Sequence, residues 1–153
     1  MIRIVGRKDG EAGSALLEFA IATVVILTLL FGIIDVGRAL YAYDWVSDAA
    51  RRGTRYAMVR GTASCTGSPE LPDCKASAAQ ITNYVMSNAV GIDASQAIVT
   101  PLCWVPASTN FTQPPCTAPN TIKVTVQYKF AFISPFVPMS WTMKSSSIRP
   151  MSQ

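Results

Sequence analysis

The sequence predicts an α+β protein in which a long N-terminal transmembrane helix continues into a domain with a second helix and a small antiparallel sheet. Three observations predict it. An apolar run extends from Gly13 to Gly32. No proline occurs before Pro69, so a helix can continue beyond that run. Late in the chain, apolar and polar residues alternate from Ile122 to Phe130, which is the pattern of a half-buried strand.

Composition places the apolar character near the N-terminus. Half of the 153 residues are hydrophobic and only 14% are charged, against about 25% in ordinary soluble domains. Histidine is absent, which removes the commonest general base and metal ligand. The net charge of +4 is too small to indicate nucleic acid. We interpret the arginines after the apolar run as a solvated helix face; they are Arg38, Arg51, Arg52, Arg55 and Arg60.

The apolar run fits a single membrane span. Its uncharged part lies between Glu18 and Asp35 and is roughly 24 Å long as a helix. Because a span needs about 20 residues, we place it at residues 14–36, with Glu18 at the membrane boundary. Basic residues in the first eight positions favour a cytoplasmic N-terminus. A cleaved signal peptide is the competing interpretation, but no A-x-A-like site follows the run.

Beyond the membrane, the helix is expected to continue to about residue 60, for a total length of about 70 Å. One stripe recurs at steps of three or four, and it either packs on the chain's own domain or receives another helix. Its members are Ala39, Tyr43, Val46, Ala50, Gly53 and Ala57. Two charge pairs suit a helix surface, Asp35 with Arg38 and Asp48 with Arg52.

Residues 61–153 are expected to form the extracytoplasmic α+β domain. After a loop at residues 61–72, Asp73 is predicted to cap a second helix that Gly91 ends. Ala78, Ile81, Val85 and Ala89 form its apolar face.

The four cysteines, Cys65, Cys74, Cys103 and Cys116, predict two disulfides in an oxidising compartment. The local pairings 65–74 and 103–116 fit the loops that they bracket, and two other connectivities stay open. Zinc is the rival interpretation, but the spacings lack C-x2–4-C pairs. We therefore expect no metal site and no cofactor.

Strands are expected at 97–99, at 122–130 and at 140–148, the last with Trp141 and Met143 in one register. In the central strand the odd-numbered residues form the polar face. A second apolar cluster is interpreted as core rather than as a contact with the membrane or another subunit. It contains Phe132, Phe136, Val137, Met139 and Trp141.

The segment GSALLEF, residues 13–19, resembles a type IV prepilin processing site. In that family a prepilin peptidase cuts after the glycine that ends a short basic leader, here residues 1–13. Cleavage after Gly13 would make Ser14 the first residue, Glu18 the fifth and Phe19 the sixth. In a pilus, Glu18 would then pair with the free amino terminus of a neighbouring subunit, because an unpaired buried charge is costly. A boundary glutamate that faces lipid headgroups is the alternative.

The longer segment 13–57 resembles the TadE-like family of tight-adherence pilus assembly proteins. The matching blocks are LEFA at 17–20, LFGII at 30–34, DVGR at 35–38, AAR at 49–51 and GTRY at 53–56. The resemblance implies a pilin-like, single-pass protein of the bacterial inner membrane with a periplasmic C-terminal domain, which enters a surface pilus after processing. Its implied partners are the prepilin peptidase and other pilus or pseudopilin subunits.

We therefore expect a minor pseudopilin-type protein that assembles a tight-adherence (Flp/type IVb) pilus by subunit packing. The alternative is a single-pass envelope binding module that never enters a filament. An enzyme is not expected, because the residues offer no Ser/His, Cys/His or metal-ligand set. We also expect neither nucleic acid nor a small-molecule substrate as a partner.

Overall fold

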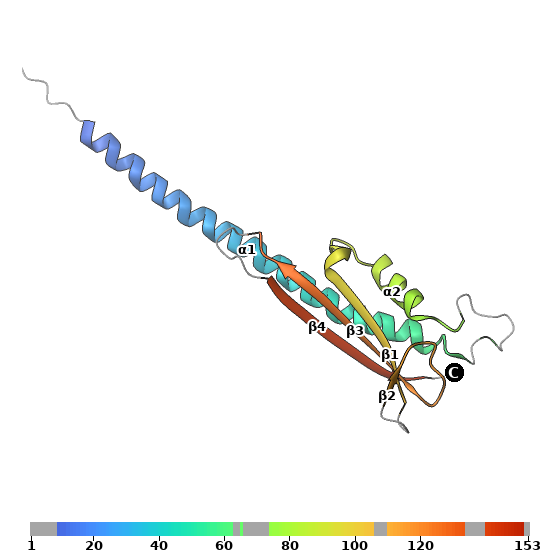
Figure 1. The fold of residues 1–153 in the computed structure, drawn as a ribbon. Coiled ribbons are helices and arrows are strands. Elements are labelled where there is room, and N and C mark those ends of the chain that lie inside the picture. The colour runs from blue at the N-terminus through green and yellow to red at the C-terminus, as the bar shows by residue number, and fades with distance from the viewer. Residues whose placement is uncertain (1–8, 63–64, 66–73, 106–109, 134–139, 152–153) are drawn as a thin grey trace, which may run out of the picture. The chain divides into compact units, whose positions relative to one another are not determined.

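The computed structural model of the chain describes residues 9–62, 65, 74–105, 110–133 and 140–151 (Figure 1). It contains two helices, α1 (Asp9–Met58) and α2 (Ala78–Ser87), the 3-10 turn η2 (Ala94–Gln96) and one four-stranded antiparallel sheet. The α+β class and the long N-terminal helix are confirmed. The chain divides into two compact units, Met1–Arg38 with Phe132–Pro138, and Ala39–Ala131 with Met139–Gln153.

Helix α1 differs slightly from its expected bounds. It begins at Asp9, before the expected start at 14, and ends at Met58 rather than at Arg60. A contact with a later segment accompanies the early end. The backbone carbonyl of Arg60 accepts the N–H of Ala76 at 3.0 Å, so the chain has already left the helix to meet the segment that precedes α2.

The buried stripe of α1 packs against its own domain. Gly53 lies so close to α2 and to β3 (Thr121–Ala131) that an added Cβ would be 2.8 Å from Val85 Cγ2 and 3.1 Å from Val124 Cγ1. The expected stripe was wrong at Tyr43, which is exposed. Four expected members, Val46, Ala50, Gly53 and Ala57, are buried, and Ala42, Trp45, Ala49 and Thr54 are buried beside them. These positions follow the 3.6-residue helical period and share one face of α1, whereas Tyr43 lies on another face.

Helix α2 starts later and stops earlier than expected. Its N-cap is Ser77, and Ser77 and Gln80 form a reciprocal capping box. The predicted cap, Asp73, lies outside the described residues. The helix ends at Ser87, so the expected stop at Gly91 was wrong, although Gly91 has the positive φ of 69° typical of a turn.

The sheet has the strand order β2-β1-β3-β4. β1 (Ala97–Val105) is longer than the expected 97–99, because it pairs with β3 along eight positions. β2 (Asn110–Thr112) lies in a segment that was expected to be a loop; it pairs with the end of β1. β4 (Ser140–Pro150) is the expected partner of β3.

The inner face of β3 forms the core. Its alternate residues Ile122, Val124, Val126, Tyr128 and Phe130 are all buried, as the alternation predicts. The ring of Tyr128 meets that of Trp45 on α1 edge to face, with centroids 6.3 Å apart. Figure 1 shows the C-terminal half of α1 lying along the sheet. The expectation that Trp141 belongs to the core was wrong, because 65% of Trp141 is exposed at the start of edge strand β4.

Other members of that second apolar cluster, Phe136, Val137 and Met139, lie outside the described residues. The structure contains the disulfides Cys65–Cys74 and Cys103–Cys116, which are the two local pairings among the connectivities that the sequence left open. The second one joins the end of β1 to the segment that precedes β3.

Candidate functional site

The N-terminal half of α1 presents an exposed, mainly apolar surface. Between residues 13 and 34, all side chains except half-buried Thr23 are exposed, and the helix is long and apolar enough to cross a membrane by length and composition. Exposure of apolar surface to water costs about 25 cal/mol per Å². The segment is therefore compatible with a single-pass membrane anchor.

The two threonine hydroxyls inside this segment have partners on their own helix. Thr23 donates to the carbonyl of Phe19 and Thr28 to that of Val24, both at 2.8 Å. A threonine that hydrogen-bonds the carbonyl four residues earlier presents little unpaired polarity to its surroundings. These two residues therefore add no unsatisfied donor to a hydrocarbon environment.

The residues of the processing motif lie within α1 and are exposed. Gly13 and Ser14 sit inside the helix, and nothing approaches within 4 Å of a Cβ added at Gly13. Glu18 follows Ser14 by four residues, so the two share one helix face. Among the residues that the structure describes, the carboxylate of Glu18 makes no ion pair. The basic residues of the leader, up to position 8, lie outside the described range.

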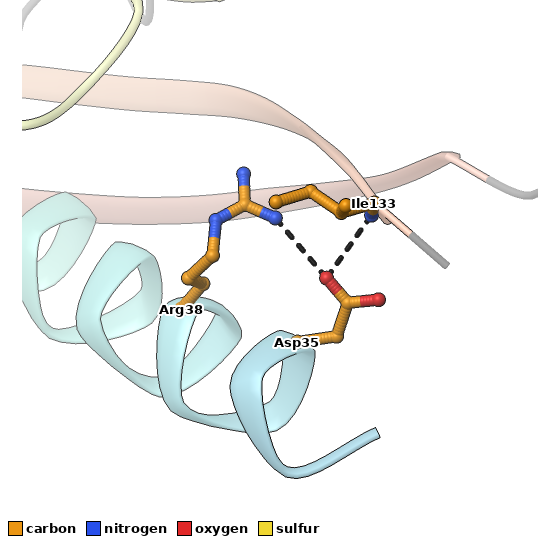
Figure 2. A network of polar contacts seen from close by, with 3 residues as sticks. All are labelled: Asp35, Arg38 and Ile133. Atoms are coloured by element: carbon orange, nitrogen blue, oxygen red, sulfur yellow. Dashed lines mark hydrogen bonds and ion pairs between the residues drawn. The ribbon is translucent and has the colours of Figure 1, made fainter. Parts of the chain in front are cut away.

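Asp35 is the first buried residue along α1 after Gly13, with 3% of its surface exposed. Figure 2 shows how its carboxylate is paired. Oδ1 accepts a hydrogen bond from Arg38 Nη1 at 3.1 Å and another from the backbone N–H of Ile133 at 3.0 Å. The Arg38 side chain keeps 42% of its surface exposed, so the pair reaches from a buried carboxylate to solvent.

This arrangement ties the chain just after β3 to the end of the apolar helix segment. A buried carboxylate is costly unless hydrogen bonds satisfy it, and a charged acceptor makes stronger hydrogen bonds than a neutral one. The sequence predicts the pairing of Asp35 with Arg38 from their spacing. It gives no sign of Ile133, because a backbone donor 98 residues away leaves no side-chain signature.

These contacts hold parts of the chain together and offer no reacting group. Within the described ranges, no cluster of three or more His, Cys, Asp and Glu side chains is placed to hold a metal ion. All described cysteines are in disulfides.

Comparison with known protein families finds a match to the family model described as TadE-like protein, over residues 13–55. Comparisons with curated proteins and with solved structures find no match. The matched segment covers less than a third of the chain and lies inside the expected segment 13–57. It includes the apolar surface, the Asp35–Arg38 pair and Gly53. Residues 13–55 therefore form a TadE-like segment, which places the similarity of this chain to known proteins in helix α1.

Proposed function

We propose that this protein is a minor pseudopilin-type component of a bacterial tight-adherence pilus and that it acts by packing against other subunits. The family match connects the chain with tight-adherence pilus systems. The observation that carries the finer proposal is the division of α1 within one family segment. Its first half exposes apolar side chains, whereas its second half buries one stripe of side chains against the sheet.

The exposed half of α1 serves two states in this proposal. In the inner membrane, lipid covers its apolar side chains. In a filament, the same side chains pack against the helices of neighbouring subunits, and small residues such as Gly32 permit close approach because nothing occupies the space beside them. Subunit assembly thus replaces one apolar environment by another, and no catalysis or cofactor is involved.

Processing after Gly13 creates a positive charge that can pair with the Glu18 carboxylate. Cleavage gives Ser14 a free ammonium group, which pairs with the Glu18 carboxylate of an adjacent subunit and sets the axial position of the two helices. The peptidase needs an accessible backbone at a helical bond. Gly10 and Gly13 favour local unwinding there, because each costs about 1 kcal/mol of helix stability relative to alanine.

Mass spectrometry of the mature N-terminus tests the pilin-like route. The protein is isolated from cells with and without a prepilin peptidase, next to a Glu18→Gln variant. We expect a peptide that starts at Ser14 only when the peptidase is present. We expect the variant to be present at normal levels but absent from sheared pili. An intact N-terminus in both strains would leave a permanent membrane anchor as the better account.

The second candidate is a membrane-anchored binding module, and exposed aromatic rings favour it. Trp104 and Phe111 are paired positions of β1 and β2, and both are partly exposed. Lys123 Nζ lies 5.6 Å from the centre of the Phe111 ring. Deletion of the protein separates the candidates. Loss of pili supports the pseudopilin, whereas normal piliation with impaired surface binding supports the module.

A further inference from the structure

We infer that copies of this chain associate side by side, with a groove on α1 of one copy receiving lysines from the sheet of the next. The inference rests on the proposed function, since it specifies how subunits pack. Both surfaces belong to the unit that comprises residues 39–131 and 139–153. The complementary charge of these two surfaces identifies a second copy of the same chain as the occupant of the groove.

The groove runs between α1 and the turn that follows α2, and its volume is about 330 Å³. Trp45 lies in its wall. The other lining residues are Tyr41, Asp44, Asp48, Arg52, Asn88 and Val90.

One carboxylate of the groove is available to a partner. Asp48 is already paired with Arg52, at 2.9 Å between Oδ2 and Nε. Asp44 is exposed and makes no ion pair within the described part of the chain. A cation from another subunit would therefore form an ion pair with Asp44 rather than with Asp48. The hydroxyl of Tyr41 holds the opposite rim in place by donating to the carbonyl of Val90.

The outer face of the sheet supplies such cations. Because opposed residues share one face, the pairing of Lys144 with Gln127 and of Thr142 with Lys129 places both lysines on the face opposite the core. Lys123 lies on the same face. The four strands contain no aspartate or glutamate, so no acidic residue within them neutralises these lysines. The two surfaces of one chain thus carry complementary charge.

The two surfaces also lie at the same level along α1. Trp45 contacts Tyr128 through the core, and each has a charged sequence neighbour, Asp44 on the helix side and Lys129 on the outer sheet face. Copies held in one membrane share one sidedness, so a neighbour at equal height presents its lysines to Asp44. The contact joins two different surfaces and is therefore heterologous, so each pair of copies leaves one groove and one sheet face free for other subunits.

Cross-linking between two tagged copies tests the contact in the full-length membrane protein. One copy carries Asp44→Cys and the other carries Lys144→Cys. A short bismaleimide cross-linker joins the two cysteines and spans the distance that the longer lysine side chain covers in the wild type. The control pairs Lys144→Cys with Tyr43→Cys, because Tyr43 is also exposed but lies about 100° away around the helix.

We expect a product that contains both tags from the first pair, and at least fivefold less of it from the control pair. No such product, with both thiols labelled by a free maleimide, would overturn the inference. An adduct of either cysteine with a different protein would overturn it as well, because the groove or the sheet would then have another occupant.

Charge reversal separates this inference from the proposed function. We expect Asp44→Lys to reduce pili about fivefold or more while cleavage after Gly13 and the protein level stay normal. Adding Lys129→Asp and Lys144→Asp in the same chain should restore pili. If deletion of the protein removes pili but Asp44→Lys does not, the contact is wrong and the function stands. If deletion leaves piliation intact, the function itself fails.

Discussion

Replacement of Gly53 by alanine tests the packing between α1, α2 and the sheet. The new Cβ would lie 2.8 Å from Val85 Cγ2 and 3.1 Å from Val124 Cγ1. Both distances are shorter than van der Waals contact. Neither valine can turn away easily, because both are buried and β-branched side chains have few alternative rotamers. The methyl group must therefore push α1 away from α2 or from β3.

Two opposing contributions set the size of the effect. Alanine in place of glycine stabilises a helix interior by about 1 kcal/mol. Overpacking of a tight core costs about 1–3 kcal/mol, and two close contacts on stiff side chains place this site near the upper end. We therefore expect Gly53→Ala to lower the free energy of unfolding by about 2 kcal/mol.

The assay is urea unfolding of the full-length protein in detergent micelles, followed by near-ultraviolet circular dichroism. Gly37→Ala is the matched control on the same helix, since nothing lies within 4 Å of its added Cβ, and it should be neutral or stabilising. Val85→Ala added to Gly53→Ala should recover part of the loss. If Gly53→Ala is as stable as the wild type, glycine is not needed at this helix crossing and the steric argument is refuted.

Three further predictions follow from single contacts. Replacing Cys103 and Cys116 together by serine should lower the free energy of unfolding by about 3 kcal/mol, measured by the same urea titration, since the bond closes a loop of 13 residues. Asp35→Ala should speed amide exchange of Ile133, because that N–H loses its acceptor. Hydrogen bonds from the Ser95 hydroxyl and N–H lower the pKa of Asp93, the N-cap residue of η2, below 3.8. This cap should hold above pH 3.8 and weaken as pH falls through the lowered pKa, as an NMR titration of the Ser95 amide would show.

Elements with strong periodicity were predictable from the sequence. The alternation from Ile122 to Phe130 identifies both the strand and its buried face, because a strand with one buried face must repeat every two residues. The apolar run and the lack of proline likewise predict one long helix. Which residues of this helix are buried was harder to predict. Small residues such as Ala39 and Ala42 are equally compatible with burial, and only the packing against the sheet determines which of them is buried.

Short elements depended on contacts that the sequence does not display. β2 has only three residues, Asn110–Thr112, all exposed. It exists because the end of β1 offers it backbone hydrogen bonds. The start of α2 is a different case. Asp73 and Ser77 are both good caps by type, but Ser77 with Gln80 three residues later is a capping-box pattern that the sequence does display.

The candidate site shows the same division between local and distant information. Spacing alone pairs Asp35 with Arg38, but only the fold brings the Ile133 N–H to the same carboxylate oxygen. This matters for the placement of α1. Asp35 lies where exposed apolar side chains give way to buried ones. A carboxylate already satisfied by protein donors and joined to a partly exposed arginine resists movement into hydrocarbon, because Arg38 and the backbone at Ile133 would have to move with it. In the proposed function, this pair therefore limits how deeply α1 enters the membrane before assembly.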